Sequence, residues 1–390
     1  MNYLSFMQRV LITGGAGFIG SHVTPALLRA GVRVRILDNL SPQIHGGVPR
    51  GLDWLSADGI EFQRGSVTSD RDLRAALDGV DAVIHLAAET GTGQSMYDIA
   101  RYSSVNLQGT ALLLDLLAND QHRSVRRVVL ASSRSIYGEG AYVCAGCAPE
   151  RRLYPQARPA QALAAHRWEH ACASCGNSLT ALPTKESDAA RPASIYAATK
   201  LGQEDLVRIT CGSLGLGYAI LRLQNVYGEG QSLNNPYTGI LSIFSTRIRR
   251  KIELPIFEDG EETRDFVHVE DVANAFVATV TSERTPDCEI NVGSGLGTSV
   301  AEVARQLGAA FSASPQLVVT GQYRLGDIRH NRADITRLKE LLDYRPRVGL
   351  AEGLQRFAAW VGAQPLPEDR LEAANAELSA RGMMGAASVS

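Results

Sequence analysis

The stretch from which the fold can be predicted reads Arg9-Val-Leu-Ile-Thr13 and then, without a break, Gly14-Gly-Ala-Gly-Phe-Ile-Gly20. The first part is a short apolar run with β-branched residues, which is typical of a buried strand. The second is a glycine turn that opens a helical pattern ending at Gly31. Glycines let the backbone approach a pyrophosphate, and a helix N-terminus favours an anion. The spacing Gly14-x-x-Gly17-x-x-Gly20 in this context therefore indicates a dinucleotide-binding unit.

A carboxylate at the end of the next strand pattern indicates which dinucleotide is bound. Residues 32–37 form the second strand pattern, which ends in Asp38. A carboxylate at this place can accept both hydrogen bonds of an adenosine ribose and would repel a 2′-phosphate. We therefore expect NAD and not NADP.

Strand and helix patterns alternate along the first part of the chain. Residues 81–88 form an apolar strand that ends in small side chains, and residues 128–131 form another that leads into Ser133. Helical patterns cover residues 72–77 and 107–117. This alternation predicts an α/β fold with a doubly wound parallel sheet of the Rossmann type, and a site at the carboxyl ends of its strands.

Composition limits the classes of partner. The chain has 390 residues, of which 45% are hydrophobic, and a formal net charge of −2. This length predicts two or three domains, and the small net charge gives no reason to expect nucleic acid or an anionic membrane. No apolar run approaches the roughly 18 residues of a membrane span, and the glycine turn leaves no room for a cleavable signal. We therefore expect a cytoplasmic protein with reduced thiols.

Tyr196 and Lys200 form a pair suited to acid–base chemistry. Residues four apart on a helix share one face, so the ammonium group can lie near the phenol. A free tyrosine titrates near ~10, and positive charge in a dry site can bring its pKa to about 7. Lys200 and an oxidised nicotinamide ring are the two candidate charges. Together with Ser133, these residues are the expected catalytic groups.

The motifs together resemble those of the extended short-chain dehydrogenase/reductases, the family of NAD-dependent nucleotide-sugar epimerases and dehydratases. The first matches are the glycine turn, Asp38, the strand ending at Ala88, Ser132-Ser133-x-x-x-Tyr137-Gly138 and Tyr196-x-x-x-Lys200. Later matches extend the resemblance to about Val361: Leu221-Arg-Leu-Gln-Asn225-Val-Tyr-Gly228, Thr263-Arg264-Asp265-Phe-Val-His-Val269 and Tyr323-Arg324-Leu-Gly326-Asp327. The resemblance implies a nucleotide-sugar substrate. It also implies a homodimer in which helices near 106–118 and 197–211 pair.

The resemblance assigns cofactor-binding roles residue by residue. The residues that inherit contact with NAD are Gly14, Gly17, Phe18, Ile19, Gly20, Asp38, Asn39, Ser66, Val67, Leu86, Ala87, Ala88, Tyr196 and Lys200. One position departs from the family pattern, because Ser66 stands where an Asp usually meets the adenine amino group. A serine can still form a hydrogen bond there, so only the strength of that contact is affected.

The resemblance also implies a set of substrate-binding residues: Glu89, Thr90, Ser133, Asn225, Phe257, Arg264, Arg324 and Asp327. Asn225 and the two arginines would hold the diphosphate, since guanidinium groups bind phosphate oxygens bidentately. Glu89 and Thr90 would face the sugar, and Phe257 would border the base. Loop capping is the alternative for Glu89 and Thr90, and surface ion pairing is the alternative for the arginines.

The residues after Ser133 distinguish two reactions of the family. Sugar 4,6-dehydratases follow this hydroxyl residue with Asp-Glu, because elimination needs an acid and a base. Here Arg134 and Ser135 follow, so no carboxylate pair is available. This favours a 4-epimerase, in which Tyr196 as phenolate removes the C4 hydroxyl proton and Ser133 stabilises the same oxygen. Hydride leaves C4 for NAD and returns to its other face.

The segment between Ser133 and Tyr196 contains four cysteines. They form two C-x₂-C pairs separated by 24 residues: Cys144, Cys147, Cys172 and Cys175. This is slightly longer than the common zinc-ribbon spacing, and four thiolates predict a closed, structural zinc site. Disulfides and free thiols are the alternatives. The insertion is expected to be either a clamp over the sugar pocket or a surface for docking a partner, and its position favours the clamp.

The cysteines narrow the expected substrate. Bacterial dTDP-L-rhamnose 4-epimerases look similar, with a Cys-rich insertion at this place and the Glu-x-Gly-x-Gly-Gln-Ser-Met pattern that begins here at Glu89. We therefore expect a dTDP-6-deoxyhexose such as dTDP-L-rhamnose. The alternatives are a UDP-hexose or UDP-uronate 4-epimerase, a sugar dehydratase or reductase, and a non-catalytic NAD-sensing protein, which would lack the Tyr196/Lys200 pair. The sequence does not separate thymine from uracil.

The expected domains follow from these assignments. Residues 7–222 form the NAD-binding domain, interrupted by the zinc-ribbon-like insertion at 139–190. Residues 223–362 form mainly a smaller α/β nucleotide-sugar-binding domain, although 265–293 are expected to return to the first. Residues 363–390 are expected to be a loose C-terminal tail with a short helical stretch.

Overall fold

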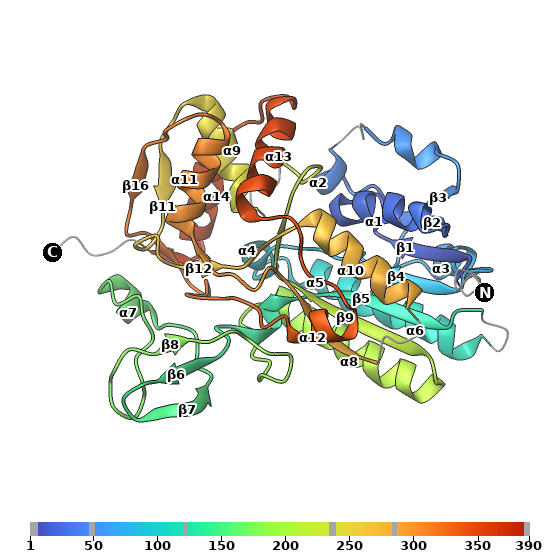
Figure 1. Cartoon of the computed structure of the whole chain (residues 1–390), viewed down its shortest axis with the longest axis horizontal. Helices are drawn as coiled ribbons and strands as arrows, with labels where there is room; N and C mark the ends of the chain where they lie inside the picture. The colour runs from blue at the N-terminus through green and yellow to red at the C-terminus, as the bar shows by residue number, and fades with distance from the viewer. Residues whose placement is uncertain (1–6, 47–50, 121–123, 234–238, 283–286, 386–390) are drawn as a thin grey trace.

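A parallel sheet with helices on both faces forms the larger part of the molecule (Figure 1). The computed structural model describes residues 7–46, 51–120, 124–233, 239–282 and 287–385. A smaller α/β unit and a small antiparallel insertion complete these described parts. The architecture confirms the predicted fold class.

The large sheet has the strand order of a doubly wound fold. Its seven strands follow the order β14-β9-β5-β4-β1-β2-β3, and every neighbouring pair is parallel. The strands are β1 (Arg9–Thr13), β2 (Arg33–Asp38), β3 (Ile60–Arg64), β4 (Ala82–His85), β5 (Arg127–Ser133), β9 (Gly217–Leu223) and β14 (Cys288–Val292). The strands β2 and β3 lie on one side of β1, and β4 and the later strands lie on its other side. In this fold a dinucleotide binds where the order of the strands switches sides, which here is between β1 and β4.

Helices cover the two faces of this sheet in separate groups. On one face, α1 (Phe18–Arg29) packs on α10 (Val269–Thr281) and both contribute to a core that includes Val10 and Ile12. The other face is covered by α3 (Asp70–Leu77), α6 (Gly109–Asn119) and α8 (Ile195–Leu214), over a core that includes Leu11. Successive residues of β1 therefore point to opposite cores, as in a strand buried on both sides.

The smaller unit has a core of its own, to which Phe244, Ile256 and Phe357 contribute. Its helices are α9 (Ile240–Arg250), α11 (Val300–Ala310) and α13 (Leu350–Gly362), and β11 (Leu254–Ile256) pairs in parallel with β16 (Leu317–Val319). Two short pairs lie between the units: β10 (Asn225–Tyr227) with β13 (Phe266–His268), and β12 (Thr263–Arg264) with β15 (Thr298–Ser299). The connections between these elements bring the substrate-side residues to the carboxyl edge of the large sheet.

The insertion is a small three-stranded sheet that projects from the rest of the molecule (Figure 1). Its strands are β6 (Tyr142–Cys144), β7 (Ala148–Leu153) and β8 (Thr180–Ala181), and all pairings are antiparallel. A short helix, α7 (Ala160–Ala164), lies between β7 and β8 in the chain. Its core is small and contains two of the cysteines, Cys144 and Cys172.

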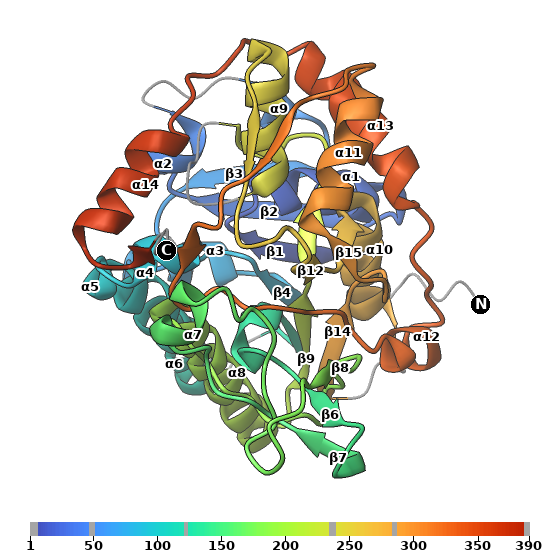
Figure 2. The ribbon, with the colours of Figure 1, turned by 90° about the vertical axis from the view of Figure 1, so that its left-hand side faces the viewer.

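The C-terminal segment is packed, which corrects the prediction of a loose tail. Helix α14 (Leu371–Ala380) buries Leu371 and Leu378, and β18 (Met384–Gly385) pairs with β17 (Tyr323–Arg324). Figure 2 shows α14 on the side of the molecule where α4 (Thr92–Ser95) and α5 (Ile99–Tyr102) lie. Apolar residues at helical spacing drive this packing, and residues 386–390 of the predicted tail lie outside the described residues.

Several short helices connect the larger elements. They are α2 (Pro42–His45), the 3-10 helices Asp53–Ser56 and Arg134–Tyr137, the π-helical turn Ser103–Gln108 and α12 (Thr336–Leu341). Among the residues described, none of the helices has the length and apolar character needed to span a bilayer.

Candidate active site

The glycine turn forms a cradle at the carboxyl end of β1. Gly14 has φ of +68°, and a Cβ there would lie 2.7 Å from the backbone of Ala87 at the end of β4. A Cβ on Gly20 would collide with the carbonyl of Gly15, so both positions require glycine. Helix α1 begins at Phe18 with Gly17 as its N-cap, and no side chain occupies that cap. The turn thus fits a pyrophosphate at the helix N-terminus.

Asp38 lies beside this cradle at the end of β2. One of its carboxylate oxygens accepts the N–H of Ala16 at 3.1 Å, and the other accepts the N–H of Leu40 at 2.8 Å. The carboxylate is buried, and each of its oxygens retains lone pairs for a further donor. The arrangement fits the ribose hydroxyls of a dinucleotide.

The other predicted cofactor residues lie along the same edge of the sheet. Residues 86–88 follow β4, and the N–H of Leu86 donates to the carbonyl of Thr13 at 3.0 Å. Ser66 follows β3, with its hydroxyl 2.8 Å from that of Thr68. Asn39 caps its own loop by accepting the N–H of Ser41. The strand ends therefore form one continuous surface. Within it, the side chains of Asn39 and Ser66 each form a hydrogen bond inside their own loop.

Ser133, Tyr196 and Lys200 come together above this surface. Ser133 is the last residue of β5, Tyr196 is the second residue of α8, and Lys200 follows one turn later. The hydroxyl of Ser194 caps α8 by accepting the N–H of Ala197 at 3.1 Å, which fixes where the helix begins. The ammonium of Lys200 donates to the carbonyl of Ala131 at 2.9 Å. Burial lowers the pKa of Lys200 to about 8, although the nearby Glu204 carboxylate acts to raise it.

The pKa of Tyr196 differs from the prediction made for it. Burial raises the pKa of Tyr196 above its ordinary value, and the groups that oppose this rise are the Ser133 hydroxyl and the Arg134 charge. Lys200 and an oxidised nicotinamide ring were the two expected charges, and the ammonium of Lys200 is directed to a backbone carbonyl. The positive side chain that acts on the phenol in this structure is therefore Arg134.

A cavity of about 240 Å³ lies next to these groups and is lined by Arg134, the residue after Ser133, although Ser133 itself is not among the residues that line it. Its walls include five of the predicted substrate residues: Asn225, Phe257, Arg264, Arg324 and Asp327. The Asn225 side-chain oxygen is buried without a hydrogen-bond partner among the described residues, and the guanidinium of Arg324 lies 4.7 Å from the centre of the Phe257 ring. The walls thus carry three arginines, Arg134, Arg264 and Arg324, which can bind an anion, beside three carboxylate side chains. The unpartnered oxygen of Asn225 can accept a hydrogen bond from a ligand.

Two predicted sugar contacts lie outside the walls of this cavity. The carboxylate of Glu89 is paired with Arg101 at 2.6 Å, and the carbonyl of Thr90 accepts the hydroxyl of Tyr102 at 2.7 Å. Neither residue lines the cavity as the structure describes it. Their assignment as sugar contacts stays a prediction.

Among the cavity residues that were not predicted to bind a ligand, three bear on its chemistry or its origin in the chain. Arg134, which follows Ser133 in the chain, lines the cavity. In the sequence it served only to show that no carboxylate follows Ser133. Glu262 contributes a buried oxygen without a hydrogen-bond partner among the described residues, and burial raises its pKa to about 7. Leu371 comes from the segment that was expected to be loose. The signal for Arg134 was present in the sequence, whereas contact of Leu371 with the cavity depends on tertiary packing.

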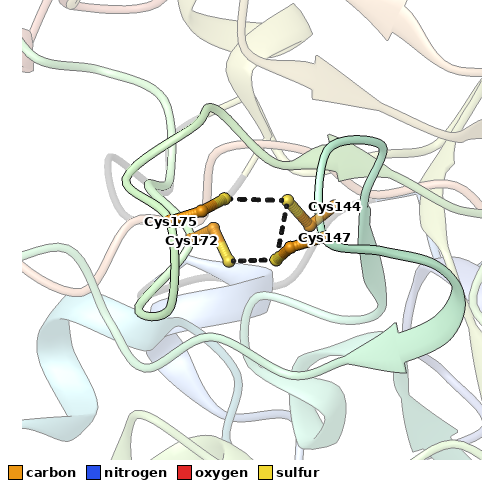
Figure 3. Close-up of side chains that lie close together, drawn as sticks. All are labelled: Cys144, Cys147, Cys172 and Cys175. Atoms are coloured by element: carbon orange, nitrogen blue, oxygen red, sulfur yellow. Dashed lines mark hydrogen bonds between the residues drawn. The ribbon is translucent and has the colours of Figure 1, made fainter.

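The four cysteines of the insertion form one cluster (Figure 3). Their sulfur atoms all lie within 4.8 Å of one another, and three of the pairs are 3.5 Å apart. All four are free thiols. Backbone N–H groups lower the pKa of Cys172 to about 6 and also lower that of Cys144. A Zn–S distance of about 2.3 Å in a tetrahedron places sulfurs about 3.8 Å apart, so the cluster fits a tetrahedral metal.

The insertion contacts the cavity wall through buried ion pairs. Arg158 donates two hydrogen bonds to the carboxylate of Glu258, at 2.7 and 2.8 Å, and one to the carbonyl of Asp327 at 2.9 Å. The carboxylate of Glu169 pairs with Arg329 at 2.7 Å. Glu258 and Asp327 line the cavity, so the insertion supports the wall from behind.

Known proteins resemble the chain over most of its length. A model of the NAD dependent epimerase/dehydratase family matches residues 10–173 and 170–293. The dTDP-L-rhamnose 4-epimerase of Burkholderia thailandensis is 38% identical over 364 residues, which is 92% of this chain and 96% of that protein.

Solved structures share the fold. The UDP-glucose 4-epimerase of Thermotoga maritima, solved with UDP-glucose, has a TM-score of 0.71 and 28% identity, covering 90% of this chain and 98% of that one. The UDP-glucose 4-epimerase of Thermus thermophilus, solved with NAD, has a TM-score of 0.69 and 27% identity, covering 92% and 100%.

Proposed function

The chain belongs to the NAD dependent epimerase/dehydratase family, and we propose that it is an NAD-dependent nucleotide-sugar 4-epimerase acting on a dTDP-6-deoxyhexose such as dTDP-L-rhamnose. The observation that carries this proposal is the group Ser133, Tyr196 and Lys200 next to a cavity lined by three arginines, with Arg134 in place of a carboxylate after Ser133. The choice of sugar is supported by the 38% identity to a dTDP-L-rhamnose 4-epimerase.

Each group of the site is given a separate role in the proposed reaction. NAD, held by the glycine turn and Asp38, supplies a hydride acceptor and donor when bound. Tyr196 as phenolate removes the proton from the C4 hydroxyl and returns it at the end of the reaction. Ser133 donates a hydrogen bond to the same oxygen and stabilises its developing charge. Lys200, one helical turn after Tyr196, would hold the nicotinamide ribose, and the Arg134 charge lowers the pKa of the phenol.

The walls of the cavity hold the substrate while its sugar changes face. Arg264 and Arg324 provide guanidinium groups for the diphosphate, and the Asn225 side-chain N–H is a further possible donor. The Asn225 side-chain oxygen, which has no partner among the described residues, can accept a hydrogen bond from the substrate. Phe257 offers an aromatic surface to the base. Because the nucleotide is fixed and only the sugar turns, the 4-keto sugar can take back hydride on its other face and the net redox change is zero.

The test is conversion of defined nucleotide sugars by the purified protein. We expect dTDP-L-rhamnose to give its 4-epimer in NMR spectra, with retention of deuterium placed at C4 and without net formation of NADH. A faster reaction with UDP-glucose or UDP-glucuronic acid would favour the UDP-sugar alternative. A dehydrated 4-keto product would reject the epimerase assignment.

Zinc in the insertion is part of the same proposal. The four sulfur atoms all lie within 4.8 Å of one another, and no disulfide joins these four cysteines, so their arrangement supports a tetrahedral metal site. We assign the metal a structural role, with the insertion as a clamp that supports the cavity wall through Arg158. One zinc per chain by elemental analysis is expected. Deletion of 143–176 with an unchanged KM would favour a docking surface instead.

A homodimer and a cytoplasmic location complete the proposal. Helix α8 carries Ile209, whose side chain is 66% exposed, and α5 carries the exposed Ile99. These apolar groups lie on or next to the helices expected to pair. Light scattering should give twice the monomer mass, and replacing Ile209 with Glu should weaken the assembly. Reduced thiols at the cysteine cluster require a reducing compartment.

A further inference from the structure

Arg134 lies in the cavity without a partner among the residues that the structure describes. It is the first residue of the 3-10 helix Arg134–Tyr137 and directly follows Ser133. Its side chain lines the cavity together with those of Arg264 and Arg324. Over the part of the chain that the structure describes, its guanidinium forms no hydrogen bond and no ion pair.

The other two cavity arginines are held by the protein. The guanidinium of Arg264 donates to the carbonyls of Thr263, Ile328 and Arg329. Arg324 donates to the side-chain oxygen of Asn375 at 3.0 Å and lies over the Phe257 ring. Their positions are thus fixed before a ligand arrives, whereas the five donors of Arg134 remain available.

A charged guanidinium without a hydrogen-bonding partner in a half-buried cavity is unfavourable in free energy unless an anion binds to it. Burial lowers the pKa of Arg134 to about 9, and the charge of Arg264 acts in the same direction. Asp327 and Tyr196 oppose this effect, so the group lies within electrostatic reach of both the phosphate side and the catalytic phenol. An anion bound between these two sides would remove the cost.

We propose that Arg134 binds the sugar-proximal phosphate of the nucleotide sugar, as a third arginine beside Arg264 and Arg324. This inference rests on the proposed nucleotide-sugar substrate and goes beyond it by naming a residue and a phosphate. A guanidinium can bind two phosphate oxygens at once, and its neighbour Ser133 acts on the sugar to which that phosphate is attached. The contact would hold the near end of the diphosphate while the sugar turns.

Binding of nucleotides without a sugar provides the test. Calorimetry on the NAD-loaded protein would compare dTMP, dTDP, UMP and UDP for the wild type and for Arg134→Gln. We expect the substitution to weaken the binding of dTDP and UDP roughly 10- to 100-fold and to leave the binding of dTMP and UMP unchanged. Arg134→Lys, which retains one charge but not the planar fork, should fall between the two. Arg151→Gln, at an exposed arginine of the insertion, is the control and should bind all four like the wild type.

Two outcomes would overturn the proposal. Equal weakening of monophosphates and diphosphates would mean that Arg134 contacts another part of the nucleotide. Unchanged binding of dTDP and UDP by Arg134→Gln would mean that Arg134 does not contact the second phosphate. Retained NAD and an unchanged melting temperature would show that the variant is folded. Because no sugar is turned over in this experiment, it stays informative even if the proposed sugar is wrong.

Discussion

The cofactor side and the substrate side of this molecule are assembled from the chain in different ways. Gly14, Asp38 and Ala87 belong to neighbouring strand ends of one sheet, and short sequence patterns predict their positions. The substrate cavity instead joins Arg134 and Leu371, which are far apart in the sequence, and its wall is supported by the insertion. A site built from consecutive strand ends can be read from local motifs. A site built from distant segments depends on packing that no motif encodes.

The largest expected effect separates chemistry from cofactor binding. Replacing Tyr196 with Phe should lower kcat by roughly 10²- to 10⁴-fold or more, because the general base is lost. NAD content should not change, since the glycine turn and Asp38 remain. Absorbance and mass spectrometry of the released cofactor would measure this, and Tyr218→Phe, remote from the cavity, is the matched control. Substantial remaining turnover would exclude Tyr196 as the base.

The next effect concerns the C-terminal segment. Ending the chain after Pro365 removes α14 and β18, and with them Leu371 from the cavity and the strand that pairs with Arg324. We expect NAD binding to persist and KM for the nucleotide sugar to rise on the order of 10-fold or more, since a buried contact and a hydrogen bond to a charged group are lost. Leu371→Ala should give a smaller rise. Equal loss of NAD and substrate binding would mean that the two sides are not separable in this way.

Removal of the metal should affect the substrate side more weakly. Cys147→Ser is expected to lose zinc and to loosen the insertion that positions Arg158 against Glu258. KM should rise several-fold while kcat and NAD content stay close to the wild type, because no cysteine contacts the reacting groups. Elemental analysis and steady-state kinetics would measure both quantities. Cys288→Ser, outside the cluster, is the control and should keep its zinc.

The smallest effect is a displacement of the pH profile. Burial raises the pKa of Tyr196, and its phenolate is the reactive form, so kcat/KM should increase with pH toward that pKa. The Arg134 charge lowers this pKa, so Arg134→Gln should move the inflection to higher pH. Arg134→Lys should restore part of the shift. An inflection that moves to lower pH in the glutamine variant would contradict the electrostatic role assigned to Arg134.

The sequence allowed a large part of the fold and of the site to be predicted. The strand, glycine turn and helix around Gly14 are local, so the Rossmann-type sheet followed from a short pattern and its parallel order was confirmed. The motifs around Asn225, Arg264 and Arg324 correctly indicated residues that gather at one cavity. Their mutual position required the family resemblance, because they lie on separate elements.

The parts that could not be predicted share a physical reason. The ion pair between the Glu89 carboxylate and Arg101 was not predicted, because no motif marks it, and the role of Glu89 as a sugar contact stays a prediction. Leu371 looked like part of a polar, loose tail, and only its packing on the cavity gives it a role. The charge acting on Tyr196 comes from Arg134 because Lys200 is directed to a carbonyl, which is a matter of side-chain rotamers. Each case depends on a long-range contact or a side-chain direction.

The packing of α14 and β18 also bears on how the protein acquires activity during translation. The β1–α1 turn and Tyr196 leave the ribosome long before Leu371 and Met384 do. A nascent chain can therefore complete its cofactor side while one wall of the substrate cavity is still being synthesised. Incomplete products released by the ribosome would hold NAD without binding nucleotide sugar well, so they would occupy cofactor without competing for substrate.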